Sequence, residues 1–193
     1  MKYDNVHKTI EVFKNGGIVV FPTDTAVGIG CRMDNEASVR RIFEIKQRSF
    51  DNALLVLVDS EEMAEQYVAI PEEVKTKLID IYWPGGLSIF FKTKLGKVSG
   101  LVTGNTDILA VRWPKHAELQ NIITAVGVPI IATSANISGG ITPYTIQDVN
   151  RQVLKKADYV MEGECTYKKE STIIDTTVTP WKKIREGAIK ISI

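Results

Sequence analysis

Apolar residues in the first part of the chain change from helical spacing to a continuous run. Val6, Ile10 and Phe13 are spaced at i, i+4 and i+7, which predicts an amphipathic helix that ends at the glycines 16–17. The wholly apolar, β-branched run at 17–21 then predicts a buried strand, which ends at a proline. The first part of the sequence therefore predicts a helix followed directly by a buried strand.

The rest of the pattern repeats this alternation. Further strands are predicted where apolar runs are bounded by turn residues, at 54–58, 87–92, 108–113 and 128–133. Further helices are predicted from apolar spacing and capping residues: one capped by Asp34 or Asn35, one capped by Ser60, one with Pro71 in its first turn, one at about 115–126, and one from the Thr145-x-x-Asp148 capping box to about Lys156. The C-terminal part is strand-like at 159–163, 171–176, 182–187 and 188–192.

The order of these elements indicates the fold class. Alternation of strands and helices over the first two-thirds predicts an α/β fold with a partly parallel sheet, and the β-rich end predicts antiparallel additions. No internal repeat and no long linker divides the sequence. We therefore expect one α/β domain over residues 1–193, with a twisted, open, mixed parallel and antiparallel sheet flanked by helices.

Composition and charge exclude several classes of protein. Of the 193 residues, 44% are hydrophobic and 24% are charged, so the chain is not a disordered or low-complexity protein. There are 24 lysine and arginine residues against 23 aspartate and glutamate residues, and a net charge of +1 excludes binding to nucleic acid by bulk positive charge. A basic patch on one face is still allowed, so the placement of the charges matters more than their sum.

Three features of the sequence indicate the cellular compartment: the cysteines, the histidines and the N-terminal segment. Cys31 and Cys165 lie far apart without metal-ligand spacing, and the histidines are His7 and His116, so we expect neither a disulfide framework nor a structural zinc site. The N-terminal segment has no apolar signal region, and no stretch approaches the roughly 18 apolar residues of a membrane span. We expect a cytoplasmic, reducing setting and no membrane partner.

The common signatures of nucleotide and hydrolase sites are absent from the sequence. There is no G-x-x-x-x-G-K-[ST] loop, and Gly28-Ile29-Gly30 continues to Met33, where a dinucleotide fingerprint would need glycine or alanine. Neither histidine lies in a catalytic motif. Instead, hydroxyl, amide and basic residues follow buried strands, and in open α/β sheets ligands bind at that edge.

Three candidate features lie before residue 113. The segment 21–30 carries hydroxyls and glycines that can bring backbone N–H groups to a ligand, or it is an ordinary polar turn. Lys46 and Arg48 follow a helical pattern and converge on one anion only if the helix ends there, or they are solvated cations favoured by the helix dipole. Arg112 ends an apolar strand, where a charge needs a partner or an anionic ligand.

Two further clusters follow. The segment 132–140 places three hydroxyls, an amide and two glycines after a buried strand, which allows a small molecule to approach the backbone closely; the alternative is a polar turn. The segment 171–175 begins with two hydroxyls, and Arg185 follows ten residues after it. In the alternative reading these hydroxyls complete a sheet edge, and Asp175 forms a cross-strand ion pair with Arg185.

In this order, the clusters resemble those of one family. The chain is similar to the threonylcarbamoyl-AMP synthase (YrdC-like) family from about Gly17 to Gly187, and its end at Ile193 matches the short, single-domain form. The matching motifs are PTDT at 22–25, Lys-x-Arg at 46–48, WPG at 83–85, AVR at 110–112, TSANISG at 133–139, STIID at 171–175 and Arg185-x-Gly187. Seven motifs in the family's order are hard to explain by accident.

The resemblance implies a concave, basic active-site cavity and a reaction. Enzymes of this family condense L-threonine, bicarbonate and ATP, in the presence of Mg²⁺, to threonylcarbamoyl-AMP and pyrophosphate, so a nucleotidyltransferase is expected. A complex of partner proteins then transfers the threonylcarbamoyl group to an adenosine of tRNA. That transferase complex is therefore an expected partner, with tRNA or double-stranded RNA as a further one.

The resemblance also implies roles for individual residues. ATP would be bound by Lys46, Arg48, Ser134, Asn136, Thr142 and Arg185. Threonine would be bound by Thr25, Arg112, Ser134 and Ser171. Lys46 and Arg48 are the expected catalytic residues, because the chemistry requires anions to be held together and phosphoryl charge to be stabilised. No side chain is expected to bind the Mg²⁺ that accompanies ATP.

The sequence departs from the family pattern at a few positions, and it leaves two other functions open. An aromatic residue is usual at Val27 and a proline at Ser49, and PGPLT is usual where Gly86 and Ser88 give PGGLS. These departures affect the expected packing around threonine and the order of the loop. The alternative functions are another carbamoyl-adenylate enzyme of the same fold and a double-stranded-RNA or tRNA-binding module without catalysis. Shape-based RNA recognition needs no buried hydroxyl–amide cluster, so TSANISG favours a small-molecule site.

Overall fold

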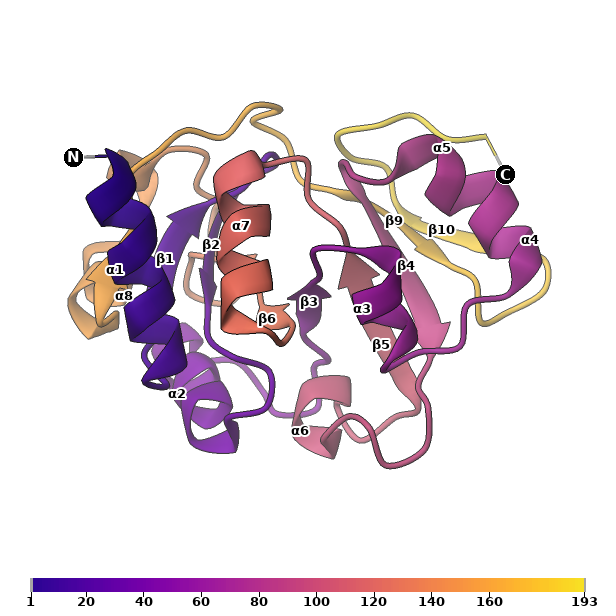
Figure 1. The fold of residues 1–193 in the computed structure, drawn as a ribbon, viewed down its shortest axis with the longest axis horizontal. Coiled ribbons are helices and arrows are strands. Elements are labelled where there is room, and N and C mark those ends of the chain that lie inside the picture. Colours follow the sequence, from indigo (N-terminus) through magenta and orange to yellow (C-terminus); the bar gives the residue numbers. More distant parts are fainter. Residues whose placement is uncertain (1, 193) are drawn as a thin grey trace.

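The strands form two mixed sheets that lie beside each other (Figure 1). A computed structural model describes the backbone of residues 2–192 and the side chains of residues 5–192. In this part of the chain the smaller sheet has the strand order β7-β2-β1-β8 and the larger has the order β10-β9-β4-β5-β3-β6. The pairs β1–β8, β3–β5 and β4–β9 are parallel and the others are antiparallel. The predicted α/β fold with mixed pairing is confirmed, but as two sheets and not one.

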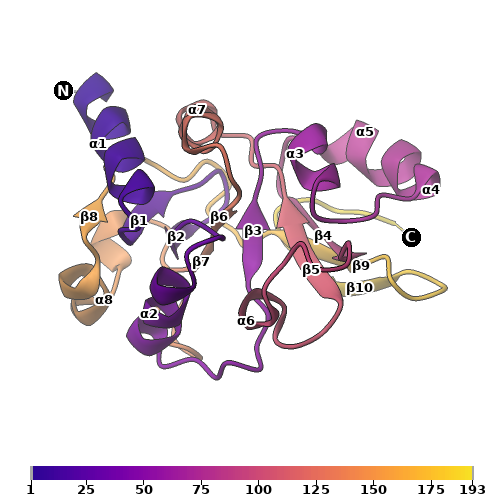
Figure 2. The same ribbon diagram turned by 60° about the horizontal axis from the view of Figure 1, so that its bottom comes forward.

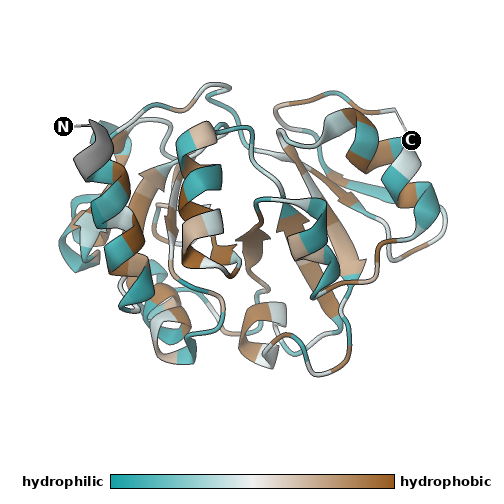
Figure 3. Ribbon diagram, viewed as in Figure 1, coloured by the Kyte–Doolittle hydropathy of each residue, from teal (hydrophilic) through white to brown (hydrophobic). Residues whose placement is uncertain are grey.

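The strands are short in both sheets. The smaller sheet contains β1 (Val19–Pro22), β2 (Val27–Gly30), β7 (Thr133–Ser134) and β8 (Tyr159–Val160). The larger sheet contains β3 (Leu55–Leu57), β4 (Leu87–Lys92), β5 (Ile108–Arg112), β6 (Ile130–Ile131), β9 (Thr172–Asp175) and β10 (Lys182–Arg185). Most of their apolar side chains are buried, and the strands are largely brown in the hydropathy colouring of Figure 3.

Helices cover the two sheets separately. Near the smaller sheet are α1 (Lys2–Lys14), α2 (Glu36–Lys46) and α8 (Arg151–Lys156), and near the larger sheet are α3 (Glu61–Glu65), α4 (Glu72–Val74) and α5 (Asp80–Tyr82) (Figures 1 and 2). The remaining helical elements are α6 (Gly100–Thr103), α7 (Ala117–Val126), a π-helical turn η1 (Lys75–Ile79) and a 3-10 turn η2 (Ile146–Asp148). None of the described helices is long and apolar enough to span a bilayer.

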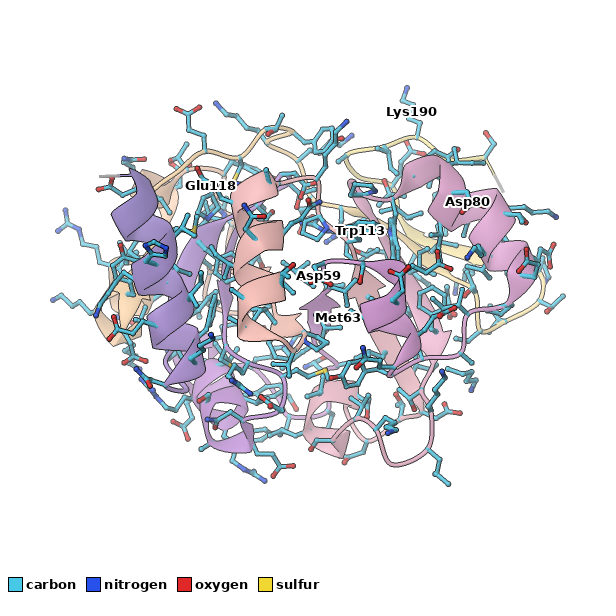
Figure 4. All side chains as sticks on the ribbon, in the orientation of Figure 1. Asp59, Met63, Asp80, Trp113, Glu118 and Lys190 are labelled. Carbon is cyan, nitrogen blue, oxygen red and sulfur yellow. The ribbon has the colours of Figure 1, made fainter. Side chains whose placement is uncertain are left out.

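A hydrogen bond connects α7 to the end of β3. Asp59 follows this strand and lies between α7 and α3 in Figure 4. Its carboxylate accepts a hydrogen bond of 2.6 Å from the Thr124 hydroxyl of α7. The helix is thereby tied to a strand whose residues Leu55 and Leu57 line the cavity described below.

Local capping residues set several helix boundaries as predicted. Asn35, and not Asp34, caps α2, because its side-chain oxygen accepts a hydrogen bond of 3.1 Å from the Ser38 amide. Ser60 caps α3 in the same way through the Met63 amide, at 3.1 Å.

The helix predicted around Pro71 differs in two respects. Pro71 precedes its helix as the N-cap and does not lie in the first turn. The single helix predicted after it contains the π-helical turn η1 between α4 and α5.

Other predictions were wrong. The helix predicted from Thr145 to about Lys156 is divided: the capping box opens only the turn η2, Val149 is extended at φ −68° and ψ 132°, and Asn150 caps α8 separately. The segment 188–192 forms no strand, whereas β2 and α6 were not predicted. Strand β2 lies in a glycine-rich segment whose pairing with β1 and β7 cannot be recognised from local periodicity.

The predicted strand 128–133 crosses from one sheet to the other. It is divided into β6 in the larger sheet and β7 in the smaller sheet, with Ala132 between them. Gly30 allows this crossing, because a Cβ atom at that position would lie 1.8 Å from the Ile131 carbonyl oxygen. The junction of the two sheets therefore depends on a close backbone approach that only glycine permits.

Candidate functional site

A cavity of about 440 Å³ is lined by residues of both sheets. Eight of the nine site residues predicted from the sequence line it: Thr25, Arg48, Arg112, Ser134, Asn136, Thr142, Ser171 and Arg185. They come from segments up to 160 residues apart in the chain, so the tertiary structure brings them together. The ninth, Lys46, does not line the cavity.

A hydroxyl-rich turn between β1 and β2 forms one wall of the cavity. The Thr23 hydroxyl accepts hydrogen bonds from the amides of Thr25 and Ala26, at 3.0 and 3.2 Å. The Thr23 and Thr25 hydroxyl oxygens are 3.0 Å apart. The first sequence cluster is thus a polar turn stabilised by Thr23, which also presents Thr25 to the cavity.

A buried ion pair lies beside this turn. The Arg112 guanidinium contacts the Asp24 carboxylate at 2.8 Å, and their side chains are 3% and 1% exposed. Arg112 also donates to the Thr25 hydroxyl, and Asp24 accepts from the Lys115 amide at 3.1 Å. Burial lowers the pKa of Arg112, and the Asp24 carboxylate acts in the opposite direction. The partner that the sequence required for Arg112 is therefore Asp24.

One nitrogen of Arg112 remains available. Its Nε atom is buried and has no hydrogen-bond partner in the described chain. A buried donor without a partner costs free energy unless a ligand or water accepts from it. Because Arg112 lines the cavity, an acceptor there would satisfy this donor.

Helix α2 ends within the Lys46-Gln47-Arg48 segment, which is the condition for its two cations to converge. Helix α2 ends at Lys46, and Gln47 adopts a left-handed conformation with φ 52°. Arg48 lines the cavity and donates to the Ala53 carbonyl oxygen at 2.9 Å, while its buried Nε atom has no partner in the described chain. Arg48 can therefore meet an anion in the cavity.

Lys46 has a different environment. It is 1% exposed, and its ammonium group donates to the carbonyl oxygens of Ser134 and Asn136 and to Asn136 Oδ1. Burial, and secondarily the charge of Arg48, lowers the pKa of Lys46 to about 7. The nucleotide contact predicted for Lys46 stays a prediction, and the contacts it makes are with the loop that presents Ser134 and Asn136.

That loop is held by its own polar groups. The Ser134 hydroxyl donates to Asn136 Oδ1 at 2.6 Å, and Asn136 Nδ2 donates to the Gly140 carbonyl oxygen at 2.5 Å. The Ser138 amide donates to the Lys46 carbonyl oxygen at 2.8 Å. The TSANISG segment is thus an ordered turn. Its residues Ser134 and Asn136 line the cavity, and Lys46 donates to their backbone carbonyl oxygens.

The opposite wall contains Arg185, Ser171 and a residue that sequence reasoning missed, Glu170. Arg185 donates from Nε to the Ser171 carbonyl oxygen at 2.9 Å and from Nη2 to the Ser171 hydroxyl at 3.2 Å. Its Nη1 atom contacts the Glu170 carboxylate at 2.8 Å. Thr142 donates to the same carboxylate at 3.3 Å.

The alternative pairing of Asp175 with Arg185 was wrong. The sheet register places Lys182 opposite Asp175 and Arg185 opposite Ile173. The Asp175 carboxylate instead accepts from the amide and hydroxyl of Thr177, at 2.8 and 2.6 Å. The only sequence signal for Glu170 is an acid directly before the STIID motif, and its meaning depends on the strand register.

The cavity combines cationic, hydroxyl and apolar groups. Its charged lining side chains are Arg48, Arg112, Arg185 and Glu170, and its apolar wall includes Leu55 and Phe90. Among the described residues, no three His, Cys, Asp or Glu side chains gather in a way that could hold a metal ion. This arrangement suits an anionic ligand of moderate size, held by guanidinium and hydroxyl donors.

Comparison with known proteins decides the family. The model of the Sua5/YciO/YrdC family, described as "Telomere recombination", matches residues 11–187. The chain belongs to the Sua5/YciO/YrdC family. The resemblance inferred from the seven motifs is therefore confirmed, and the match includes every residue of the candidate site.

Members of the Sua5/YciO/YrdC family include close relatives of this chain. A protein of Methanocaldococcus jannaschii, provisionally named threonylcarbamoyl-AMP synthase, is 38% identical over 95% of this chain and 88% of its own length. The threonylcarbamoyl-AMP synthase of Pyrococcus abyssi is 35% identical over 97% of this chain, which spans 58% of that relative. The crystal structure of P. abyssi Sua5 complexed with L-threonine matches with a TM-score of 0.87 and 33% identity, over 97% of this chain and 55% of that chain.

Proposed function

We propose that this protein is an L-threonylcarbamoyladenylate synthase, an enzyme of the nucleotidyltransferase class. It would condense L-threonine, bicarbonate and ATP to threonylcarbamoyl-AMP and pyrophosphate. The observation that carries the proposal is the convergence of three arginines, the Thr25 turn and the TSANISG loop on one cavity. Two relatives that this chain matches over nearly all its length are named for the same activity, and one solved relative holds L-threonine.

Threonine is proposed to bind at the end of the cavity formed by Thr25, Arg112 and Ser171. Arg112 has an unpartnered Nε–H, and a guanidinium suits the planar carboxylate of an amino acid. Thr25 and Ser171 supply hydroxyls beside it, and Ser134 lines the same cavity from β7, in the smaller sheet that also carries the Thr25 turn. This assignment follows the roles that the family resemblance implies for these residues.

The nucleotide is proposed to bind along the rest of the cavity. Arg48 and Arg185 supply positive charge for the phosphates, and Ser134, Asn136 and Thr142 supply hydrogen-bonding groups. Lys46 would act mainly by fixing the loop that carries Ser134 and Asn136. Mg²⁺ would enter with ATP and neutralise phosphate charge, since Mg²⁺ commonly keeps several waters and binds substrate phosphates.

The proposed reaction needs positioning and electrostatic stabilisation more than an activated nucleophile. The threonine amine and bicarbonate form a carbamate with loss of water, and a carbamate oxygen forms a bond to the α-phosphorus of ATP while the bond to the pyrophosphate oxygen breaks. Charge that develops on the phosphoryl oxygens would be stabilised by Arg48 and Arg185. No covalent enzyme intermediate forms, which fits a cavity with no cysteine or histidine among the described residues that line it.

The decisive experiment measures pyrophosphate release from ATP while each substrate is omitted in turn. Release that requires both L-threonine and bicarbonate, with threonylcarbamoyl-AMP detected by mass spectrometry, is the expected result. Release that is indifferent to threonine would overturn the proposal. A parallel titration with RNA at rising salt tests the alternative of an RNA-binding module. The RNA affinity of such a module would fall steeply with salt.

The product is proposed to pass to a protein complex that modifies an adenosine of tRNA in the cytoplasm. Threonylcarbamoyl-AMP is a reactive mixed anhydride, so a group-transfer step must consume it. Reconstitution of N6-threonylcarbamoyladenosine on unmodified tRNA, with this chain as the only source of the adenylate, tests this step. Absence of the modified base despite adenylate formation would contradict it.

A further inference from the structure

Ser88 is a buried hydroxyl in the middle of an otherwise apolar strand segment. It is 0% exposed and lies in β4 between Leu87 and Ile89, both of which are also fully buried. A buried hydroxyl costs free energy unless it forms a hydrogen bond. Ser88 donates to the hydroxyl oxygen of Ser171, the residue directly before β9, at 2.9 Å, and β9 pairs in parallel with β4. Ser88 and Ser171 both line the cavity, and the Ser88 hydroxyl directs its hydrogen to Ser171.

Ser171 has both of its acceptor positions occupied. Its hydroxyl oxygen accepts one hydrogen bond from Ser88 at 2.9 Å and another from Arg185 Nη2 at 3.2 Å. A hydroxyl has two acceptor lone pairs and one donor hydrogen. Its own hydrogen is then the only remaining group, and no acceptor for it occurs among the described residues. The Ser171 O–H is thus free to donate into the cavity.

Arg185 cannot reverse this arrangement. A guanidinium has no acceptor, so its bond to the Ser171 hydroxyl always runs in the same direction. Its position is fixed by two further contacts, to the Ser171 carbonyl oxygen at 2.9 Å and to the Glu170 carboxylate at 2.8 Å. Ser88 is therefore the residue that decides whether the second lone pair of Ser171 is occupied.

Close to Ser171 the cavity presents another donor, Arg112 Nε–H, which has no partner in the part of the chain that the structure describes. Arg185 and Arg112 are close enough for the charge of Arg185 to lower the pKa of Arg112. Among the described residues, Arg48 Nε is a further donor without a partner, but it belongs to the wall assigned to the nucleotide. The Ser171 O–H and Arg112 Nε–H are the two that remain at the threonine end, and together they match the oxygens of a carboxylate. A ligand group that donates hydrogen bonds would find no free acceptor on Ser171.

We propose that Ser88 is a positioning residue for amino-acid binding: by occupying the second lone pair of Ser171, it holds the Ser171 hydroxyl as a donor to the carboxylate of the substrate. The inference rests on the proposed function, because it takes the carboxylate to be that of L-threonine. Replacement of Ser88 by alanine frees that lone pair, and the Ser171 hydrogen is then no longer restricted to pointing at the substrate.

The experiment measures L-threonine and ATP binding by isothermal titration calorimetry in wild type, Ser88→Ala, Ser88→Thr and Ser88→Cys. Ser88→Ala is expected to weaken threonine binding about tenfold, as for a hydrogen bond to a charged group, and to leave the ATP Kd unchanged. Ser88→Thr keeps the hydroxyl and should restore threonine binding; if the added methyl group unfolds the protein, Ser88→Cys keeps the size and should give intermediate affinity. KM for threonine, and not kcat, should follow the same order.

A double-mutant comparison separates positioning from a general structural role. Once Ser171→Ala has removed the hydroxyl, adding Ser88→Ala should cause no further loss of threonine affinity, whereas a structural role of Ser88 would still cause one. Thr9→Val is the matched control, because Thr9 is also 0% exposed and hydrogen-bonded, at 2.8 Å to Asn5, but lies in α1. It should lower thermal stability and leave the threonine Kd unchanged.

The outcomes distinguish this proposal from the proposed function. Wild-type protein that binds no L-threonine would overturn both. Wild-type protein that binds threonine while folded Ser88→Ala binds it equally well would overturn the role of Ser88 alone. An additional loss from Ser88→Ala in the Ser171→Ala background would also contradict it.

Discussion

The Lys46 ammonium group lies 2.7 Å from the Asn136 carbonyl oxygen, so this buried cation holds the loop that lines the cavity. Its other acceptors are the Ser134 carbonyl oxygen and Asn136 Oδ1. Arg48, two residues later, does line the cavity. The Lys-x-Arg motif therefore divides its two charges between the support of the site and the site itself.

The burial of Lys46 predicts a particular pH dependence of stability. Its pKa is about 7 in the folded protein against 10.5 for an unperturbed lysine. Between these values the unfolded chain binds more protons, so the free energy of unfolding should rise with pH from about 7 to 10.5. Urea unfolding of wild type and Lys46→Met at about pH 6.5 and pH 9 tests this, since the variant lacks the titrating group. Equal pH dependence in the two proteins would refute it.

Replacement of Arg48 should impair the reaction without unfolding the protein. Arg48→Ala removes a cation that lines the cavity, and loss of one such group typically lowers turnover by about 10²–10³. The measurement is threonine-dependent pyrophosphate release, with thermal unfolding as the check on the fold. Arg40→Ala, on the exposed surface of α2, is the matched control and should keep full activity. Normal turnover in Arg48→Ala would remove Arg48 from the proposed mechanism.

The Asp24–Arg112 pair should contribute strongly to stability when one partner is lost. Both side chains are at least 97% buried, so Asp24→Asn would leave the Arg112 charge without compensation. Breaking a buried pair in this way typically costs about 3–5 kcal/mol in the free energy of unfolding.

The exposed pair Lys92–Asp107 provides the comparison. Its side chains are 52% and 66% exposed, and pairs of this kind contribute about 0–1 kcal/mol. When the unfolding of both variants is measured by urea titration, Asp107→Asn should therefore change the free energy of unfolding far less than Asp24→Asn. Similar losses in the two variants would show that burial does not control the strength of the inner pair.

Glu170 should weaken the binding of anions to the cavity. It is the single carboxylate among the described residues that line the cavity, and Glu170→Gln removes that charge while keeping an acceptor for Arg185. Removing a repulsion of about 1 kcal/mol should lower the ATP Kd about fivefold, more at low salt than at high salt. Calorimetric titration with ATP tests this, and Glu164→Gln, an exposed position of the same loop, should have no effect. Weaker ATP binding in Glu170→Gln would show that its contact with Arg185 matters more than its charge.

The sequence by itself determined many of the local elements and the residue types of the site. Helix α2 could be predicted because apolar spacing and the Asn35 cap act within a few residues of each other, and the same is true of Ser60 and α3. The sequence left the end of α2 open, since Lys46 and Arg48 could converge on one anion only if the helix ended there; the helix does end at Lys46, but only Arg48 lines the cavity. Motif order identified the family, because each motif is a short continuous segment that can be read without the fold.

Only the tertiary structure decided which of these residues meet. Asp24 and Arg112 are 88 residues apart, Lys46 and Asn136 are 90 apart, and Ser88 and Ser171 are 83 apart. Such contacts depend on the order and register of paired strands, and a shift of one residue would turn Arg185 or Ser88 to the other face of its sheet. Local periodicity does not contain this register. The direction in which Lys46 points, the partner of Arg185 and the hydrogen-bonding state of Ser171 are therefore properties of the folded sheets.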